Sequence, residues 1–549
     1  MRWERIILVR FFLYFGIASY YIRDGFISVV FTVEKSTKCI YNNSLVNHAR
    51  SCAMILLVQN DTEYENDLRE MISAFFLGEK IKISTPSEVA SFDRERFGRF
   101  RFMITALFDE KNASLRMEEK GHVIFSAYIY GDYKNRKRYR NKLKLAIYRL
   151  LSEYTRRELP WGSLTGMRPT KIATQALAKG KSVEEIVDYY NYTYDATLEK
   201  ANLATEVALK EKSIIESVNP LTDYCLYINI PFCPTKCLYC SFAAYPIMEY
   251  DRRIGEYIDT LKQELQHIAF VNRNRNLVAV YMGGGTPTSL NSTELGSIIQ
   301  CVRETFDISK LREFTVEAGR PDSITREKLE MMKKHCVTRI SINPQTMNAD
   351  TLRKIGRAHT PADIKQAMRD ARKIGFKNIN MDIIAGLPGE TLTEMEYTLD
   401  QITELAPESL TVHSLAIKRA AHLNERFEEF ENDINHDTDK MLSLVAARTK
   451  KAGLEPYYLY RQKNIAGNLE NVGYSKPGLE CIYNILIMEE SLDTFAAGAG
   501  AITRLLTTDN GKVTRVDRVE NCKNVDEYMS RIDEMLERKN AGVAARLLT

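Results

Sequence analysis

Cysteine is scarce in this chain, with 10 in 549 residues, and that scarcity excludes a small secreted scaffold held together by disulfides. Neither sign of charge predominates, because 76 Lys and Arg against 72 Asp and Glu leave a net charge of +4. Domains that bind nucleic acid usually carry a strong basic excess, so no nucleic-acid partner is expected. Beyond residue 35 there is no long apolar run, and no internal repeat is visible. The remaining composition, 44% hydrophobic and 27% charged, predicts a cytoplasmic enzyme with several globular domains of roughly 150 residues each.

The N-terminus departs from this picture. The apolar run IILVRFFLYFGIASYYI (residues 6–22) is shorter than the about 20 residues that span a membrane, and Arg10 interrupts it. A polar stretch follows, and Met54 then opens a strand-like run and an amphipathic helix. We therefore interpret residues 1–53 as a leader that is not part of the native protein; a membrane anchor over residues 6–33 and a signal peptide are the alternatives. The leader carries seven basic residues against three acidic ones, which is the whole net charge of the chain.

Residues 54–160 predict a small α+β domain. Runs rich in β-branched and aromatic residues predict strands at MILLVQN, KIKIS, FRFMITALF and HVIFSAYIYG, and a helical period predicts helices over residues 64–76 and 140–154. Residues 161–220 begin with the turn-rich segment WGSLTGMRPT and then have a helical pattern throughout. We expect them to form a helical linker region.

From residue 221 to 453, short β-rich runs alternate with helical segments. Strands are predicted over residues 225–230, 277–282, 313–317, 339–342, 378–385 and 409–414. Successive βα units with right-handed crossovers form a parallel sheet that curls towards a barrel. The α/β fold expected is therefore a partial (β/α)6 barrel with its functional loops at the carboxyl ends of the strands. Residues 454–549 predict an irregular α+β C-terminal accessory region.

The first barrel strand is followed by a cysteine motif, IPFCPTKCLYCSF. Cys233, Cys237 and Cys240 have the spacing CxxxCxxC, on a loop that Pro231 and Pro234 keep from becoming a helix. Three thiolates so close can bind three corners of one 4Fe–4S cluster and leave the fourth iron open to another ligand. A structural zinc site is the alternative, but no fourth Cys or His follows at a familiar spacing. The other seven cysteines form no second motif, so we expect them to be small buried apolar side chains.

Further motifs end the later strands. In GGGTPT (residues 283–288) the glycines let the backbone approach a ligand closely and offer N–H donors. Glu317 ends the third strand, where a carboxylate can accept hydrogen bonds from ribose hydroxyls. Asp382 lies within the apolar fifth strand, and a buried carboxylate there requires a partner or a ligand. These residues are predicted to share one edge of the sheet with the cysteines.

Together these motifs resemble the radical S-adenosylmethionine enzymes, whose signature is CxxxCxxC. Within them, the chain is similar to the oxygen-independent coproporphyrinogen III oxidase (coproporphyrinogen dehydrogenase) family, in its HemZ-type branch. The resemblance runs from about Met54 to the C-terminus and is densest in IPFCPTKCLYCSF, GGGTPT, TVEAGRPD, RISINPQTMN, IGRAHT, MDIIAGLPGE, TVHSLAIKRA and YRQKNIAGNLENVGYSKPG. It implies a partial barrel, a 4Fe–4S cluster and S-adenosylmethionine. The implied reaction belongs to heme biosynthesis: two propionates of coproporphyrinogen III are oxidatively decarboxylated to vinyls, with electrons from a donor such as flavodoxin or ferredoxin.

The resemblance also implies roles for individual residues. Cys233, Cys237 and Cys240 would bind the cluster. No catalytic residue is implied. The residues implied at S-adenosylmethionine are Tyr227, Tyr239, Gly284, Gly285, Thr286, Glu317, Gln345, Arg357 and Asp382.

Two departures from the family pattern leave alternatives open. Asn229 stands where the archetypal oxidase branch has a histidine, and Ser241 and Phe242 follow Cys240 where that branch has a further cysteine motif. The phenylalanine resembles the heme-chaperone branch, so a heme carrier is the first alternative. Radical chemistry on another tetrapyrrole is the second. An RNA-modifying enzyme is the third, and it would use the basic run at residues 134–144, for which a solvated helix face is the other interpretation.

A tetrapyrrole substrate with four carboxylates requires cationic groups near the mouth of the barrel. The candidates are Arg168, Arg320, Lys418 and Arg419, and for each of them solvation at the surface is the preferred interpretation.

Overall fold

The structure is a computed structural model of the chain. It describes residues 17–21, 29–34, 54–109, 112–131, 135–418, 420–430, 433, 437–462, 465–509 and 512–547. The chain divides into two compact units, the first made of residues 1–167, 182–202 and 463–469, and the second of residues 168–181, 203–462 and 470–549. Within residues 1–53, where a leader is predicted, only Ile17–Tyr21 and Val29–Glu34 are described. Most of the predicted leader, and with it the alternatives for that segment, therefore lies outside the described residues, whereas Met54 itself is described and begins a strand.

The first unit is a mixed sheet with two long helices. In its described part the strand order is β1-β2-β7-β6-β5-β3-β4. The strands are β1 (Ile17–Tyr21), β2 (Val29–Glu34), β3 (Met54–Gln59), β4 (Ile81–Ser84), β5 (Phe100–Phe108), β6 (Asn112–Glu119) and β7 (His122–Tyr130). The helices are α1 (Glu65–Phe75), the short α2 (Pro86–Val89) and α3 (Arg94–Gly98), and α4 (Arg136–Thr155). The four predicted strands are β3, β4, β5 and β7, and the sequence prediction missed β6.

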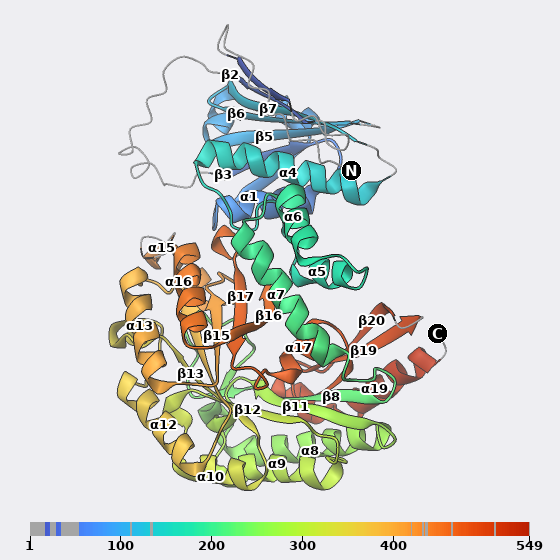
Figure 1. Ribbon diagram of the computed structural model, residues 1–549, viewed down its shortest axis with the longest axis vertical. Helices are drawn as coiled ribbons and strands as arrows, with labels where there is room; N and C mark the ends of the chain where they lie inside the picture. Colours follow the sequence, from blue (N-terminus) through green and yellow to red (C-terminus); the bar gives the residue numbers. More distant parts are fainter. Residues whose placement is uncertain are drawn as a thin grey trace. The chain divides into compact units, whose positions relative to one another are not determined.

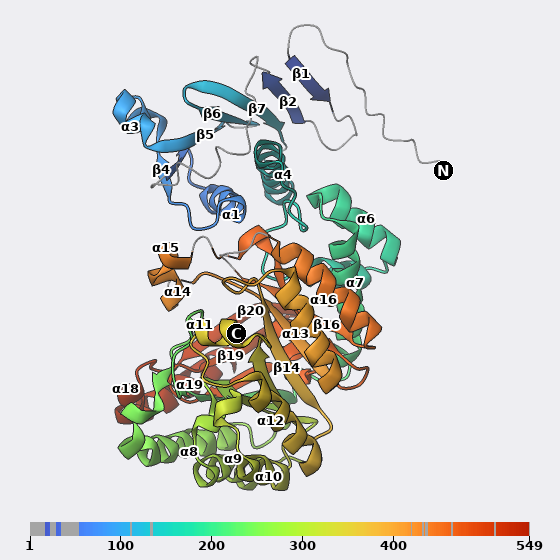
Figure 2. The same cartoon turned by 90° about the vertical axis from the view of Figure 1, so that its left-hand side faces the viewer.

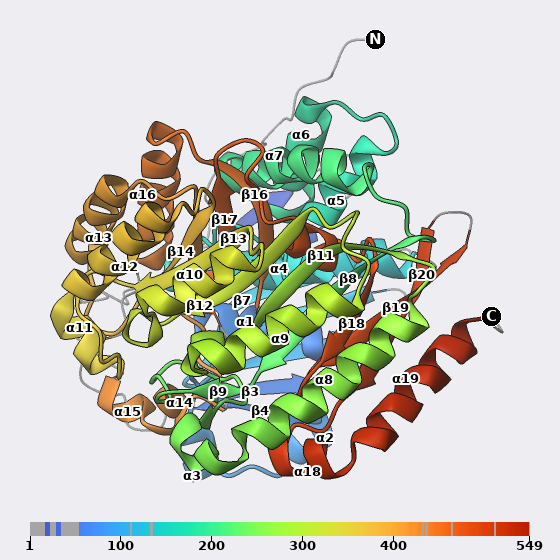
Figure 3. The ribbon, with the colours of Figure 1, turned by 90° about the horizontal axis from the view of Figure 1, so that it is seen from below.

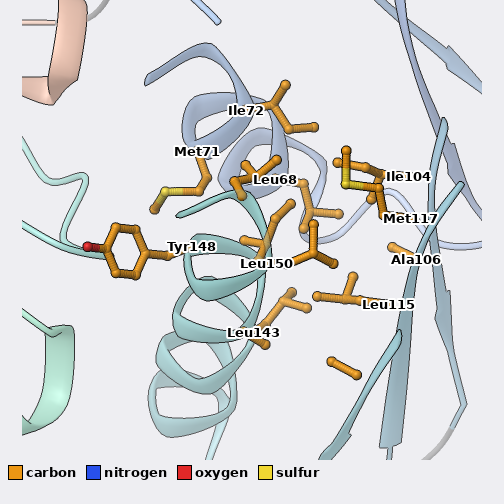
Figure 4. Close-up of a cluster of buried hydrophobic side chains, with 14 of the residues drawn as sticks. Leu68, Met71, Ile72, Ile104, Ala106, Leu115, Met117, Leu143, Tyr148 and Leu150 are labelled. Atoms are coloured by element: carbon orange, nitrogen blue, oxygen red, sulfur yellow. The ribbon is translucent and has the colours of Figure 1, made fainter. Parts of the chain in front are cut away.

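The core of this unit lies between the sheet and helices α1 and α4 (Figure 4). Leu68, Met71 and Ile72 recur at helical spacing, so α1 presents them to the sheet as one apolar face. Leu115 and Met117 alternate with polar residues along β6 and point to the same core. The apolar residues that recur at helical spacing in α1 and at strand spacing in β6 are therefore buried in the same core.

The region predicted as a helical linker contains three helices. They are α5 (Thr170–Leu177), α6 (Val183–Tyr194) and α7 (Leu198–Ile215). A capping box formed by Ser182 and Glu185 starts α6.

The second unit contains the predicted βα repeats. Six parallel strands lie side by side in chain order: β8 (Asp223–Ile230), β11 (Asn276–Gly284), β12 (Glu313–Gly319), β13 (Arg339–Gln345), β14 (Ile379–Ala385) and β15 (Ser409–Ser414). The helices between them follow the outside of the sheet (Figures 1 and 3). They are α8 (Ile254–Val271), α9 (Ser292–Thr305), α10 (Arg326–Lys334), α11 (Ala349–Lys354), α12 (Pro361–Ile374) and α13 (Leu392–Leu405). The predicted partial (β/α)6 barrel is confirmed.

The C-terminal region extends this sheet at both edges. Strands β16 (Glu455–Arg461) and β17 (Glu470–Ser475) add antiparallel strands beyond β15. At the other edge β18 (Asp493–Ala497) pairs in parallel with β8, and β19 (Ile502–Asp509) and β20 (Lys512–Glu520) follow as a hairpin. The helices of this part are α14 (His422–Glu425), α15 (Phe427–Phe430), α16 (Thr438–Lys451), α17 (Ile482–Met488), α18 (Val525–Ser530) and α19 (Ile532–Leu547). Helices α18 and α19 lie beside α8 (Figure 2).

None of the helices in the described ranges is both long and apolar enough to cross a membrane.

Candidate functional site

The three motif cysteines lie together at the carboxyl end of β8, on what we call the cluster loop (residues 231–242). Cys233 ends the short strand β9 (Phe232–Cys233), which pairs with β10 (Tyr245–Pro246). Cys237 is buried, and Cys233 and Cys240 are half-buried. Burial raises the pKa of the Cys233 thiol to about 11, and the neighbouring thiols of Cys240 and Cys237 raise it as well. A cluster bound here would hold the three cysteines as thiolates, because its irons offset their mutual repulsion.

The remaining cysteines follow the prediction in part. Cys225, Cys301 and Cys481 are buried, as predicted. Cys336 is exposed, so that part of the prediction is wrong, because this residue occupies a left-handed turn (φ 63°) at the end of α10. Cys522 is half-buried.

Arg320 secures the cluster loop from β12. Its guanidinium donates from Nη1 to the Thr235 carbonyl (3.0 Å) and hydroxyl (2.7 Å) and lies 3.8 Å from Cys237 Sγ. The same side chain forms an ion pair with Asp322, N to O 2.8 Å. Arg320 is almost fully buried. It is therefore committed to the loop, and its prediction as a contact for substrate carboxylates is wrong.

The glycine loop (residues 283–288) packs against the cluster loop without room for side chains. Gly285 N donates to the Ile230 carbonyl (2.8 Å), and Thr286 N donates to the Phe232 carbonyl (2.7 Å). A Cβ atom on Gly285 would lie 2.5 Å from Phe232 O. Gly284 has φ +110°, and a Cβ there would lie 2.1 Å from Asn229 Oδ1. Only glycine suits both positions. The close approach is to the end of β8 and the cluster loop and not to a ligand, and the N–H groups of Gly285 and Thr286 donate to carbonyls there, so the prediction that they serve as donors to a ligand is wrong for these two.

Two carboxylates of the barrel interior differ in their protonation. Burial raises the pKa of Glu317 to about 7, although the Tyr281 hydroxyl donates to its Oε1 at 2.5 Å. Burial would also raise the pKa of Asp382, but attraction from His413, whose Nε2 lies 3.9 Å from Oδ2, and a 2.6 Å hydrogen bond from Asn380 lower it instead. Near neutral pH, Asp382 is therefore charged while Glu317 is poised to gain or lose a proton.

Two polar side chains beside these groups have buried atoms with no hydrogen-bond partner among the described residues. Gln345 ends β13 with φ 68°, and its Oε1 is such an atom. Arg357 donates from Nη2 to the Tyr239 hydroxyl (3.0 Å) and from Nη1 to the Asn343 carbonyl (3.2 Å), whereas its Nε meets no acceptor in the part of the chain that the structure describes. Orphaned buried polar groups are costly, so they fit a site whose hydrogen bonds are completed by a polar ligand.

Tyr227 lies in a stack of tyrosines inside the barrel. Its ring lies 6.2 Å from those of Tyr281 and Tyr483, nearly parallel to both. Its hydroxyl donates to Asn229 Oδ1 (3.3 Å), and the Asn229 amide donates to the Ala499 carbonyl (2.5 Å). Asn229 stands at the position where the archetypal oxidase branch has a histidine. Its side chain connects Tyr227 to the turn after β18.

The sequence reasoning missed His413 and Tyr460. Tyr460 on β16 lies 3.4 Å from His413 Nδ1, and His413 faces Asp382. His413 stands one residue before the end of β15. The rule that functional residues follow barrel strands could have found it.

Arg168, another cation predicted to contact the substrate, already has partners within the chain. Arg168 donates to the Met488 carbonyl and to Glu490 (both 2.7 Å). Both partners come just before β18, whose first residue pairs with the start of β8. They therefore lie at the amino end of the barrel strands, whereas Cys233 lies at the carboxyl end. The prediction that Arg168 serves the barrel mouth is therefore wrong. Arg419 lies outside the described residues.

In the basic run at residues 134–144, two arginines pair with acidic residues in helix α1 and shortly before it. Arg136 forms an ion pair with Glu63 and Arg140 with Asp67, N to O 2.7 Å in both pairs. The run therefore helps to attach α4 to the α1 side of its own unit.

Comparison with known proteins agrees with this geometry. Residues 227–402 match the model of the radical SAM superfamily. The chain is 40% identical over 395 residues to the oxygen-independent coproporphyrinogen-III oxidase-like protein HemZ of Bacillus subtilis, covering 71% of this chain and 79% of that protein. It is 32% identical over 287 residues to the heme chaperone HemW of the same species, covering 50% and 69%. Among solved structures, the coproporphyrinogen III oxidase HemN of Escherichia coli has a TM-score of 0.47 at 22% identity, covering 60% of this chain and 73% of that one.

The barrel and its cysteine loop define a radical SAM protein. The chain belongs to the oxygen-independent coproporphyrinogen III oxidase family, in its HemZ-type branch. Proteins of this superfamily use a 4Fe–4S cluster and S-adenosylmethionine. The three cysteines, the close packing of Gly284 and Gly285, and the atoms of Gln345 and Arg357 without a partner among the described residues are the groups that would hold that pair of cofactors. In the described part of the chain no three His, Cys, Asp or Glu side chains are already arranged around one metal position.

Proposed function

We propose that this chain catalyses the oxygen-independent oxidative decarboxylation of the propionates of coproporphyrinogen III to vinyl groups, which gives protoporphyrinogen IX. The naming of the Bacillus subtilis HemZ relative as coproporphyrinogen-III oxidase-like supports this substrate. One observation carries the proposal: the cluster loop, the glycine loop and the unpartnered atoms of Gln345 and Arg357 meet at one edge of the barrel. The three cysteines at that edge would bind a cluster with one open iron, and the polar atoms would contact a ligand beside it.

The roles of the residues follow from their chemistry. Cys233, Cys237 and Cys240 would bind three irons, and Tyr227, Tyr239 and the glycine loop residues Gly284, Gly285 and Thr286 would line the cofactor. Glu317, Gln345, Arg357 and Asp382 would make its polar contacts, with Glu317 accepting from ribose hydroxyls. The cluster and S-adenosylmethionine supply one-electron, hydrogen-abstracting chemistry when bound. The protein orients the reacting groups and excludes water from them.

Each propionate loses carbon dioxide, one hydrogen atom and one further electron as its two methylene carbons become a vinyl group. Electrons for the cluster would come from a small cytoplasmic donor such as flavodoxin or ferredoxin, and a one-electron acceptor would take the second electron. The buried setting of the site suits such chemistry, because a reactive organic radical must be kept from water and oxygen.

The decisive experiment is an anaerobic turnover assay with the reconstituted protein, coproporphyrinogen III and S-adenosylmethionine. We expect divinyl product and about four irons per chain, and we expect Cys237→Ala to lose both the product and the optical and paramagnetic signature of the cluster. A wild type that holds its cluster but releases no vinyl product would contradict the proposed reaction.

A heme carrier is the second candidate function. It is favoured by Phe242 after Cys240 and by the similarity to the heme chaperone HemW. Stoichiometric heme binding without turnover in the same preparation would support the carrier instead of the oxidase.

A further inference from the structure

An exposed aromatic ring stands beside the cluster loop together with an unpaired cation. Phe242 ends the loop with 65% of its surface exposed, which is unusual for so large an apolar side chain. Lys418 Nζ lies over this ring, 5.9 Å from its centroid, within the range of a cation–π contact. The pair therefore offers a flat apolar surface and a positive charge at one place.

The pair belongs to the carboxyl edge of the barrel. Phe242 is two residues beyond Cys240, and Lys418 lies on the loop that follows β15. Hydrogen bonds join the two loops: Leu423 N donates to the Leu238 carbonyl (2.8 Å), and Lys236 Nζ donates to the Ala420 carbonyl (3.2 Å). The Cys240 thiol is close enough to Lys418 to act on its charge. A molecule resting on Phe242 would therefore lie next to the cluster.

Lys418 lacks an anionic partner. Within the described residues its ammonium makes neither an ion pair nor a hydrogen bond, although it is partly buried. A cation withdrawn from water gains most from a carboxylate that arrives with a ligand. The second cation, Lys236, bonds one carbonyl and retains donors of its ammonium group.

We infer that Phe242 and Lys418 form the recognition platform for a carboxylated tetrapyrrole, with the Phe242 ring against one pyrrole ring and the Lys418 ammonium paired with a propionate. The inference rests on the proposed function and assigns it a substrate-binding face. An aromatic face favours a flat ring, and the single charge over it selects a ring that bears an acidic side chain. Both groups act on binding and take no part in the hydrogen abstraction.

The experiment is a fluorescence titration of anaerobically reconstituted holoprotein with coproporphyrin III, the stable fluorescent form of the macrocycle. Phe242→Ala should weaken binding on the order of tenfold, and Lys418→Met should weaken it about fivefold and flatten its dependence on salt. Lys418→Arg should keep most of the affinity. The matched control is Phe270→Ala, since Phe270 on α8 is 66% exposed and carries Arg273 4.7 Å over its ring, at the far side of the barrel strands.

The outcomes separate this inference from the proposed function. Equal affinity of the wild type, Phe242→Ala and Lys418→Met overturns the platform and leaves the oxidase proposal standing. Absence of porphyrin binding by the wild type overturns both. If Phe242→Ala binds porphyrin normally but its cluster is reduced more slowly by flavodoxin, the face serves the electron donor and the inference is wrong.

Discussion

Gly285 illustrates how much the site depends on single residues. A methyl group there would meet the Phe232 carbonyl at 2.5 Å, so Gly285→Ala must push the glycine loop away from the cluster loop. We expect it to lower the affinity for S-adenosylmethionine at least tenfold and to reduce the iron content of the reconstituted protein, a cost of about 1–3 kcal/mol. Gly255→Ala is the control, because a Cβ at Gly255 meets nothing within 4 Å. Equal cofactor affinity in the two variants would contradict this account.

Glu317 predicts a dependence of cofactor binding on pH. Its pKa of about 7 means that part of the free protein holds a proton at this carboxyl below neutrality. A carboxylate accepts from ribose hydroxyls only when ionised, so binding should release a proton and affinity should rise with pH up to about 7 and then level off. Isothermal titration at pH 6, in buffers of different ionisation enthalpy, measures that proton.

Two variants control the experiment on Glu317. Glu317→Gln should bind more weakly and without pH dependence. Asp382→Asn should bind more weakly and keep a pH dependence that is shifted to lower pH, since the Asp382 charge is one of the causes that raise the pKa of Glu317. Proton release by Glu317→Gln equal to that of the wild type would assign the titration to another group.

The residues of the site divide into those that motifs reveal and those that only the fold brings together. CxxxCxxC and GGGTPT could be read from the sequence because their chemistry is local to a few residues. The link from Tyr460 to His413 could not, because it joins strands that pair only through β17. The role of Arg320 was also predicted wrongly. An arginine that follows a barrel strand can contact either a substrate or a neighbouring loop, and only the structure shows that Arg320 contacts Thr235 of the cluster loop.

At the scale of elements, periodicity predicted the barrel strands to within a few residues but missed β6 in the first unit. Ala113, Leu115 and Met117 do alternate there, yet Ser114, Arg116 and Glu118 between them lower the β propensity of the segment. The alternation alone would have been enough to predict the strand, because a strand of an antiparallel sheet needs only one apolar face.

Helix α7 contains a carboxylate whose burial predicts a stabilising substitution. Glu211 is fully buried, and neither of its oxygens has a hydrogen-bond partner among the described residues. Burial raises its pKa well above 4.5, and the nearby Glu489 adds to the effect. The folded chain therefore holds a proton that the unfolded chain releases above pH 4.5. Stability is lost as the pH rises from there towards the raised folded value, at up to about 1.4 kcal/mol per pH unit.

Glu211→Gln should remove this loss. We expect a higher free energy of unfolding than the wild type at pH 7 and no gain near pH 4, measured by urea denaturation at both values. The exposed Glu206 on the same helix supplies the control, because Glu206→Gln should change little at either pH. A gain that is the same at pH 4 and pH 7 would mean that ionisation of Glu211 is not its cause.

At the scale of the whole molecule, the C-terminal region was the hardest part to predict. Its strands join both edges of the barrel sheet, with β17 against β15 and β18 against β8. Pairings between segments far apart in the chain, Ser409 with Ser475 and Tyr224 with Asp493, leave no local period in the sequence. The order of the βα repeats is local and therefore predictable, whereas the strand that flanks β8 arrives from the end of the chain.

A buried ion pair between Glu264 and Lys539 holds the C-terminal region against the first barrel helix. Glu264 of α8 accepts from Lys539 of α19 (2.5 Å) and Asn521 (2.8 Å) on one oxygen, and from Tyr528 (2.6 Å) and the Gly498 amide (2.8 Å) on the other. Every donor comes from the C-terminal region, and the acceptor comes from the first barrel helix. The residue after Gly498 is Ala499, whose carbonyl holds Asn229 beside the glycine loop, so the pair connects the end of the chain to the cofactor site.

Breaking one half of this pair should therefore affect stability and cofactor binding together. Lys539→Met leaves a buried carboxylate without its cation, and we expect it to lower the free energy of unfolding by about 3–5 kcal/mol and to weaken S-adenosylmethionine binding at temperatures where the barrel remains folded. The double variant Glu264→Gln with Lys539→Met removes both charges and should recover part of the stability, because no unpaired charge is then left buried. Arg531→Met is the control, since its ion pair with Glu534 lies on the exposed side of the same helices. A loss of stability in Lys539→Met no larger than in Arg531→Met would show that the C-terminal helices are held by apolar packing instead of by the Glu264 pair.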